Sequence, residues 1–334
     1  MTDSPQNDVI VTKDMPLQAI EALQDKEPSK PPRSRGKDVW DQFSKHKGAM
    51  FGLGFLTFIT LAVLIGPWIY QVDPQKIDIR NKDFRPIYVA LWDSGAKTGW
   101  LKPFGSDQLG RDQLAQMIAG GRASMAVGWA AMILSLVIGT AVGVAAGFFK
   151  RLDGFLMRTT DLFLSLPILP LVLLAVTLFR QPLRANFGPE GGMFILIVTM
   201  IAITSWMPTA RIVRGDILAI KEREFILAAR SIGTTPLKII RRHLLPNVLS
   251  PIMVSAALGL ATAIITESAL SFLGVGFPSD FPTWGKMLAD AVVRMEEFPE
   301  RVLLPGIAIS VTVLSVNYVG DGLRDALDPR IRGR

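Results

Sequence analysis

The feature that most constrains the fold is a series of long apolar runs that carry no charge. The first, Gly48 to Val72, has no Asp, Glu, Lys or Arg over 25 positions. A helix rises about 1.5 Å per residue, so this run is about 37 Å long and can cross the hydrocarbon core of a bilayer. It is too long for the core of a signal peptide, and no A-x-A cleavage site follows it. We therefore predict an uncleaved membrane-spanning helix.

Five later runs pass the same test, and 49% hydrophobic residues with a mean hydropathy of +0.35 favour a membrane protein. We predict an all-α, polytopic fold with six transmembrane helices and both termini on one side. The five further spans are Ala123 to Phe149, Leu162 to Phe179, Gly191 to Ala210, Leu244 to about Leu273, and Val302 to Gly320. In the second, Gly139 and Gly143 predict close helix packing, and in the third, Pro167 and Pro170 predict a kink.

The net charge of +7 and the isoelectric point near 9.7 are typical of nucleic-acid binding in a soluble domain. Here the basic excess lies in segments that flank apolar runs, which indicates membrane orientation and no nucleic-acid partner. The segments richer in Lys and Arg, including loop 211–247, are predicted to be cytoplasmic, with both termini. Residues 1–47 are expected to form a disordered cytoplasmic tail, with Trp40 and Phe43 as an anchor in the lipid interface. Residues 325–334 form a second, short tail.

Loop 211–247 has an internal helical pattern. From Glu224 to Ile232, apolar residues recur one turn apart, and Phe225, Ala228, Ala229 and Ile232 are predicted to share one face. Gly233 then predicts a left-handed cap, and Pro236 the start of a second, basic helix. Such a pair of helices can project from the membrane and dock in a groove of a partner.

The same loop resembles the EAA loop of ABC importer permeases, in which it forms the coupling helices that sit on the ATPase subunits. Two positions depart from that family's signature: Leu227 stands in place of its glutamate, and His243 in place of the usual isoleucine. The resemblance implies that the loop ends in a Leu-Pro stop at Leu245 and Pro246. It also implies an ATPase-coupling role for Glu224, Ala228, Ala229, Arg230, Gly233, Pro236, Leu245 and Pro246.

A second motif closes the predicted extracytoplasmic loop 73–122. It reads FGSDQLGRD from Phe104 to Asp112, and Ser106 or Asp107 can cap a helix that starts near Leu109. The motif is similar to the G-T-D-x-L-G-R-D element of the C-type subunit of dipeptide and oligopeptide permeases. On this resemblance we count Gly105, Asp107, Gly110, Arg111 and Asp112 as candidate site residues.

Glu267 is the one acidic residue deep in an apolar run. It opens the segment ESALSFLGVG, which with WGKML from Trp284 matches two further elements of the same family. An ionisable group inside a span is costly and often belongs to a transport pathway. The alternatives are a structural partner for an arginine or a backbone amide, or a position near the outer surface.

Motifs for catalysis are absent from the sequence. It has no P-loop, no H-E-x-x-H and no G-x-S-x-G element, and its two histidines, His46 and His243, lie far apart. Without cysteine it has no disulfide and no thiolate site. We therefore expect no enzymatic activity and no cofactor bound by this chain.

The resemblance implies the type I ABC importer permease fold, with a core at residues 123–324, in the cell membrane of a prokaryote. It also implies three kinds of partner besides membrane lipid: a homologous second permease, two ATPase subunits or domains that hold ATP and Mg, and an extracytoplasmic solute-binding protein. The expected function is half of the translocation pathway for peptides or similar small solutes. The alternative is an ion-coupled secondary transporter or a channel subunit, which would show inverted repeats or lack the projecting helices.

Overall fold

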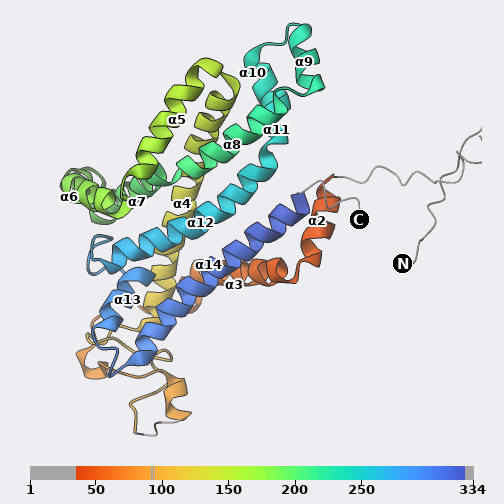
Figure 1. The fold of residues 1–334 in the computed structure, drawn as a ribbon. Helices are drawn as coiled ribbons and strands as arrows, with labels where there is room; N and C mark the ends of the chain where they lie inside the picture. The colour runs from red at the N-terminus through yellow and green to blue at the C-terminus, as the bar shows by residue number, and fades with distance from the viewer. Residues whose placement is uncertain (1–34, 92, 94, 328–334) are drawn as a thin grey trace, which may run out of the picture.

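The computed structural model describes residues 35–91, 93 and 95–327, and their regular secondary structure is helical (Figure 1). The longer helices are α2 (Arg35–Lys45), α3 (Lys47–Ile69), α4 (Gln113–Phe148), α5 (Lys150–Ser165), α6 (Ile168–Phe187), α7 (Pro189–Ser205), α8 (Met207–Ile220), α9 (Glu224–Ser231), α12 (Leu249–Phe272), α13 (Trp284–Val292) and α14 (Pro299–Leu327). Short turns of helix complete the list: η1 (Ile79–Asn81), η2 (Ile87–Leu91), α10 (Pro236–Ile239), η3 (Ile240–Leu244) and α11 (Leu245–Asn247).

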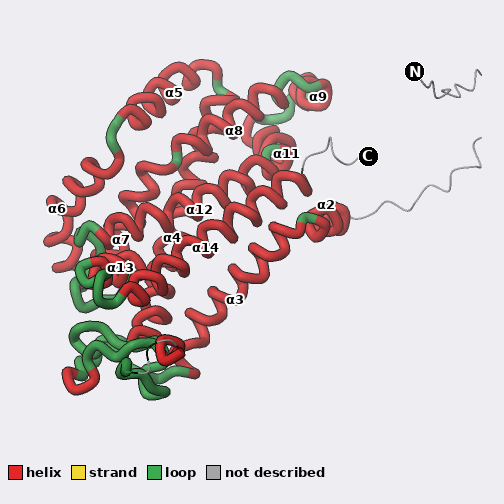
Figure 2. Tube along the Cα trace, turned by 60° about the horizontal axis from the view of Figure 1, so that its bottom comes forward, coloured by secondary structure: helices red, strands yellow, loops and turns green. Residues whose placement is uncertain are grey.

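Five described helices are long and apolar enough to cross a membrane: α3, α4, α6, α12 and α14. Helices α7 and α8 form a sixth candidate span if they are counted together. A short break separates them, and their axes are bent by 42° there. The all-α architecture with six predicted spans agrees with this arrangement. Figure 2 shows the long helices side by side and most of the loops gathered at one end.

Several helices differ in extent from the predicted apolar runs. The helix that contains the second predicted span begins ten residues before Ala123, because α4 continues through Arg122 to a cap at Asp112. Neither Ser106 nor Asp107 therefore starts a separate helix at Leu109. The third span is not a helix kinked by Pro167, which instead separates α5 from α6 as the N-cap of α6. A charged side chain does not end a helix when its backbone hydrogen bonds can continue.

The tail expected at residues 1–47 is helical where the structure describes it. Helix α2 covers Arg35–Lys45, and Phe43 is buried between α3 and α14, close to Ala49 and Ala326. The disorder expected for this part was therefore wrong, since Phe43 finds an apolar site on the chain itself. Trp40, 54% exposed, stacks on Phe43, while residues 1–34 and 328–334 lie outside the described residues.

Helix α4 is the centre of the packing and contacts α3, α7, α8, α12 and α13. A Cβ at Gly139 would lie 2.6 Å from the carbonyl oxygen of Trp206, and one at Gly143 would lie 2.7 Å from that of Ala210. The close packing predicted from this glycine pair is confirmed, with α8 as the partner.

We call the end of the molecule with α9 and α10 the α9 end, and the opposite end, with loop 70–112 and α13, the α13 end (Figure 1).

Candidate functional site

Helix α9 packs against the rest of the protein through two buried side chains. Ile226 is fully buried and Ala229 is 6% exposed, in a cluster that includes Val213, Ile217 and Leu244. Burying an isoleucine contributes about 1.5–3 kcal/mol, so α9 is held against the bundle. The single face predicted from the sequence was wrong, because Ala229 points inward while Phe225 and Ile232 are 46% and 82% exposed.

A glycine turn closes α9. Gly233 has φ +79°, and its N–H donates to the carbonyl oxygen of Arg230 at 2.9 Å, while Thr234 N donates to Ala229 O at 3.1 Å. These bonds satisfy carbonyl groups that the helix end would leave free. Pro236 is the first residue of α10, where its missing N–H costs nothing. The predicted helix, glycine cap and proline start are confirmed.

The second half of the loop differs from the prediction. Leu245 and Pro246 do not end a helix: they lie in α11, between the π-helical turn η3 and the long helix α12. Leu245 N donates to Ile240 O, five residues back, so the chain accommodates Pro246 by widening the preceding turn. The helical path from α10 to α12 thus connects α9 to a membrane span.

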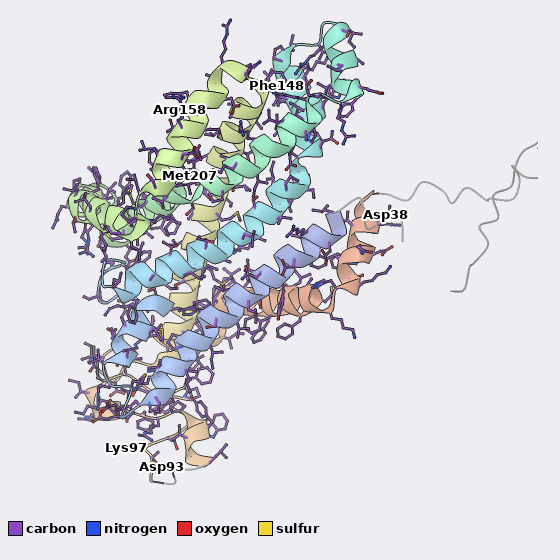
Figure 3. The ribbon with its side chains drawn as sticks, viewed as in Figure 1. Asp38, Asp93, Lys97, Phe148, Arg158 and Met207 are labelled. Atoms are coloured by element: carbon purple, nitrogen blue, oxygen red, sulfur yellow. The ribbon has the colours of Figure 1, made fainter. Side chains whose placement is uncertain are left out.

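Polar contacts fix the segments around α9. Lys221 Nζ donates to the carbonyl oxygen of Gly147 at 3.0 Å, and the Arg230 guanidinium lies 5.6 Å from the ring centre of Phe148, which Figure 3 labels. Arg214 of α8 donates two hydrogen bonds to the carboxylate of Asp153 in α5. These bonds from Arg214 lower the pKa of the Asp153 carboxyl below its usual value.

The exposed part of this loop is apolar and basic. We call Phe225, Leu227, Ile232 and Leu237 the coupling surface; they are between 45% and 82% exposed. A shallow groove beside it is lined by Thr235, Leu237, Lys238, Arg241 and Arg242. Exposed apolar side chains rimmed by polar and charged residues are typical of a protein-binding surface.

The FGSDQLGRD motif lies at the α13 end and forms a tight corner, and its Asp107 also lines a small pocket. Gly105 and Gly110 have φ +81° and +76°. A Cβ at Gly110 would lie 1.8 Å from the carbonyl oxygen of Asp78, and one at Gly105 would lie 2.4 Å from that of Phe84. Only glycine fits at these two positions.

The two aspartates of the motif accept hydrogen bonds within the same corner. Asp107 accepts from Arg111 Nε at 2.6 Å and from two backbone N–H groups, at Leu109 and Arg111. Asp112 caps α4 by accepting from Ala115 N, and its other oxygen accepts from Tyr70 O–H at 2.8 Å. The motif therefore ties α3, α4 and the preceding loop together, and its residues lie far from α9.

Sequence reasoning missed a second anchor at the α13 end. Asp83, whose φ is +58°, accepts hydrogen bonds at 2.9 Å from both Arg294 and Arg301. The guanidinium groups of Arg85, Arg294 and Arg301 lie 3.9–5.2 Å from the ring centre of Phe298. No local pattern could have revealed this cluster, because its partners are more than 200 residues apart.

Glu267 lies inside the chain, in α12, with no exposed surface. Its Oε1 accepts from Ser271 Oγ at 2.7 Å. Among the described residues no ion pair with an arginine, lysine or histidine forms at this carboxyl group. This burial favours a structural role over contact with a transported solute.

Comparison with known proteins identifies the family. The model of the "binding-protein-dependent transport system inner membrane component" family matches residues 116–333, and that of the "N-terminal TM domain of oligopeptide transport permease C" matches residues 34–86. The chain belongs to the permeases of binding-protein-dependent ABC importers. It is thus a transport component and a multi-pass protein of the bacterial inner membrane.

Named relatives cover nearly the whole permease. It is 35% identical to the oligopeptide transport system permease protein OppC of Bacillus subtilis over 305 residues, 91% of this chain and 92% of the relative. It is 36% identical to the di/tripeptide transport system permease protein DppC of Pseudomonas aeruginosa over 297 residues, 89% and 92% of the two chains.

The fold also matches a chain of the inward-facing MetNI methionine ABC transporter, with a TM-score of 0.52. The match covers 64% of this permease and 97% of that chain, at 18% identity. The permease therefore has the type I importer fold. Family and fold do not support the alternative of an ion-coupled secondary transporter or channel.

Proposed function

We propose that this permease forms one half of the translocation pathway of a peptide importer and pairs with a homologous second permease. The substrate class rests on the relatives, whose names describe oligopeptide and di/tripeptide transport. A solute-binding protein would deliver the peptide at the α13 end. ATP and Mg would be held by two separate ATPase subunits or domains at the α9 end.

The observation that carries the coupling role is the division of α9 into two faces. Ile226 and Ala229 attach the helix to the bundle, while Phe225, Leu227 and Ile232 remain exposed. A partner bound to the exposed side chains would move α9. Buried contacts attach α9 to α8, and the chain connects it through η3 and α11 to α12. Motion of the ATPases would then reach the membrane spans as rigid-body movement.

The charge distribution supports the orientation. Lys238, Arg241 and Arg242 lie on the loop at the α9 end, and Lys150 and Arg151 begin α5 beside it. Basic residues next to spans mark the cytoplasmic side, so the α9 end and both termini would be cytoplasmic. Loop 73–122 and α13 would then be extracytoplasmic.

The role of the FGSDQLGRD motif follows from its contacts. Gly105, Gly110, Asp107, Arg111 and Asp112 would act by fixing loop 70–112 to the first turn of α4. The motif would thereby present a stiff extracytoplasmic surface to the binding protein.

Copurification tests the proposal. The tagged permease, extracted in mild detergent, should bring a second six-span permease and a vanadate-sensitive ATPase, identified by mass spectrometry and an activity assay. Recovery of a stable homo-oligomer of this chain, without ATPase activity, would refute it.

A further inference from the structure

The environment of Glu267 consists of hydroxyl groups from three separate elements. Ser271, one turn further along α12, donates to Oε1, while Oε2 accepts no hydrogen bond. The hydroxyls of Ser124 in α4, Thr283 before α13, and Ser268 in α12 also lie beside the carboxyl group. A buried carboxyl group is costly unless polar groups such as these hydroxyls surround it.

Two of the hydroxyls are already bound to the start of α13. Thr283 Oγ1 accepts from Lys286 N at 3.2 Å as the N-cap of α13, and Ser124 Oγ accepts from Trp284 N at 3.3 Å. A hydroxyl that accepts one N–H still has its own proton to donate. The acceptor that lies beside both hydroxyls is the carboxyl group of Glu267, which thus sits where α4, α12 and the cap of α13 meet.

Close backbone packing surrounds the same point. A Cβ at Gly285 would lie 2.2 Å from the carbonyl oxygen of Ser268, and one at Gly121 would lie 2.7 Å from the ring of Trp284. Trp284 is fully buried, and its Nε1 donates to Met117 O at 3.0 Å. The first turn of α13 thus packs tightly against both α4 and α12, at the residue that follows Glu267.

We propose that Glu267 is a positioning residue that fixes α13 to α4 and α12, and that it does not contact the transported solute. It acts through the hydroxyls of Ser124 and Thr283, which hold the first N–H groups of α13. The inference goes beyond the proposed function, because it concerns the attachment of α13 and can be measured without transport.

Thiol accessibility tests this role, since the chain has no cysteine of its own. Ala291→Cys places a single thiol on the inner side of α13, where the alanine is 7% exposed. In nanodiscs, Glu267→Ala should speed maleimide labelling of this thiol about tenfold, the effect of losing a buried hydrogen-bonding group. Glu190→Ala, which removes an exposed acid, is the control and should leave labelling unchanged.

Conservative variants separate positioning from simple space filling. Glu267→Gln keeps an acceptor of the same length and should restore slow labelling to within about twofold. Glu267→Asp keeps the carboxyl group but withdraws it by one methylene, and should label as fast as Glu267→Ala. Ser124→Ala removes one hydroxyl at little cost in volume and should also speed labelling, which provides the test if Glu267→Ala fails to insert.

Two results would overturn the proposal. One is unchanged labelling in both Glu267→Ala and Ser124→Ala. The other is a Glu267→Gln permease with slow labelling but an altered ratio of uptake between acidic and basic dipeptides, which would place Glu267 in the pathway. If no variant transports because the proposed function is wrong, the labelling rates still decide the role of Glu267.

Discussion

Ile232→Asp at the end of α9 tests the coupling surface most sharply. The Ile232 side chain is 82% exposed and belongs to none of the buried clusters of the described residues, so the substitution should leave the permease folded. A partner that covers this side chain gains about 1.5–3 kcal/mol from its burial. Its loss corresponds to about a 10- to 150-fold weaker affinity, and the new carboxylate adds a desolvation cost.

The assay is titration of the copurifying ATPase subunits onto the immobilised permease. Val293→Asp is the matched control, because Val293 is also a β-branched residue, is 79% exposed, and lies at the α13 end. We expect Ile232→Asp to weaken binding and Val293→Asp to bind as wild type. Equal affinity for all three chains would refute the assignment of this surface. Ala229→Arg should also abolish binding, but by displacing α9 from the buried cluster in which Ala229 packs.

Three further predictions concern single contacts. In Gly233→Ala the added Cβ would meet no neighbouring atom, but the alanine must adopt a left-handed conformation at a cost of about 1 kcal/mol. Hydrogen-exchange protection of α9 should fall by that amount. Gly233→Pro should abolish both this protection and ATPase binding. Asp83→Asn leaves the buried Arg301 without its carboxylate, which should lower the free energy of local opening of loop 70–112 by about 2 kcal/mol. Limited proteolysis should then cleave this loop faster, and unchanged cleavage would contradict this. The lowered pKa of Asp153 means that its bond to Arg214 stabilises the fold above a pH of about 4 and is lost as pH falls through the folded pKa. Asp153→Asn should therefore unfold at the same acid pH or higher, with a shallower pH dependence than wild type.

The spans and the glycine turn were predictable because their causes are local. A run without charge must be helical in a bilayer, where every backbone group needs an internal partner, and α3 follows the predicted run to within a few residues. Gly233 needs no more than its neighbours to form a cap. These features depend on residues that are adjacent in the sequence.

The features that were missed depend on distant residues. The inward face of α9 is set by Val213 and Leu244, and the bond partners of Asp83 lie in α14 and just before it. For Glu267 the sequence leaves a pathway role and a structural role open, because neighbours such as Ser124 belong to another helix. Period and charge predict which segments are helical, but not which neighbour each face meets.

Uptake into proteoliposomes tests the central claim most directly. The copurified complex is reconstituted with ATP inside and the solute-binding protein with labelled peptide outside. The account predicts uptake that requires both ATP and the binding protein, and that Ile232→Asp strongly reduces it. Uptake driven by a proton or sodium gradient without ATP, or by ATP with undiminished rate in Ile232→Asp, would contradict it.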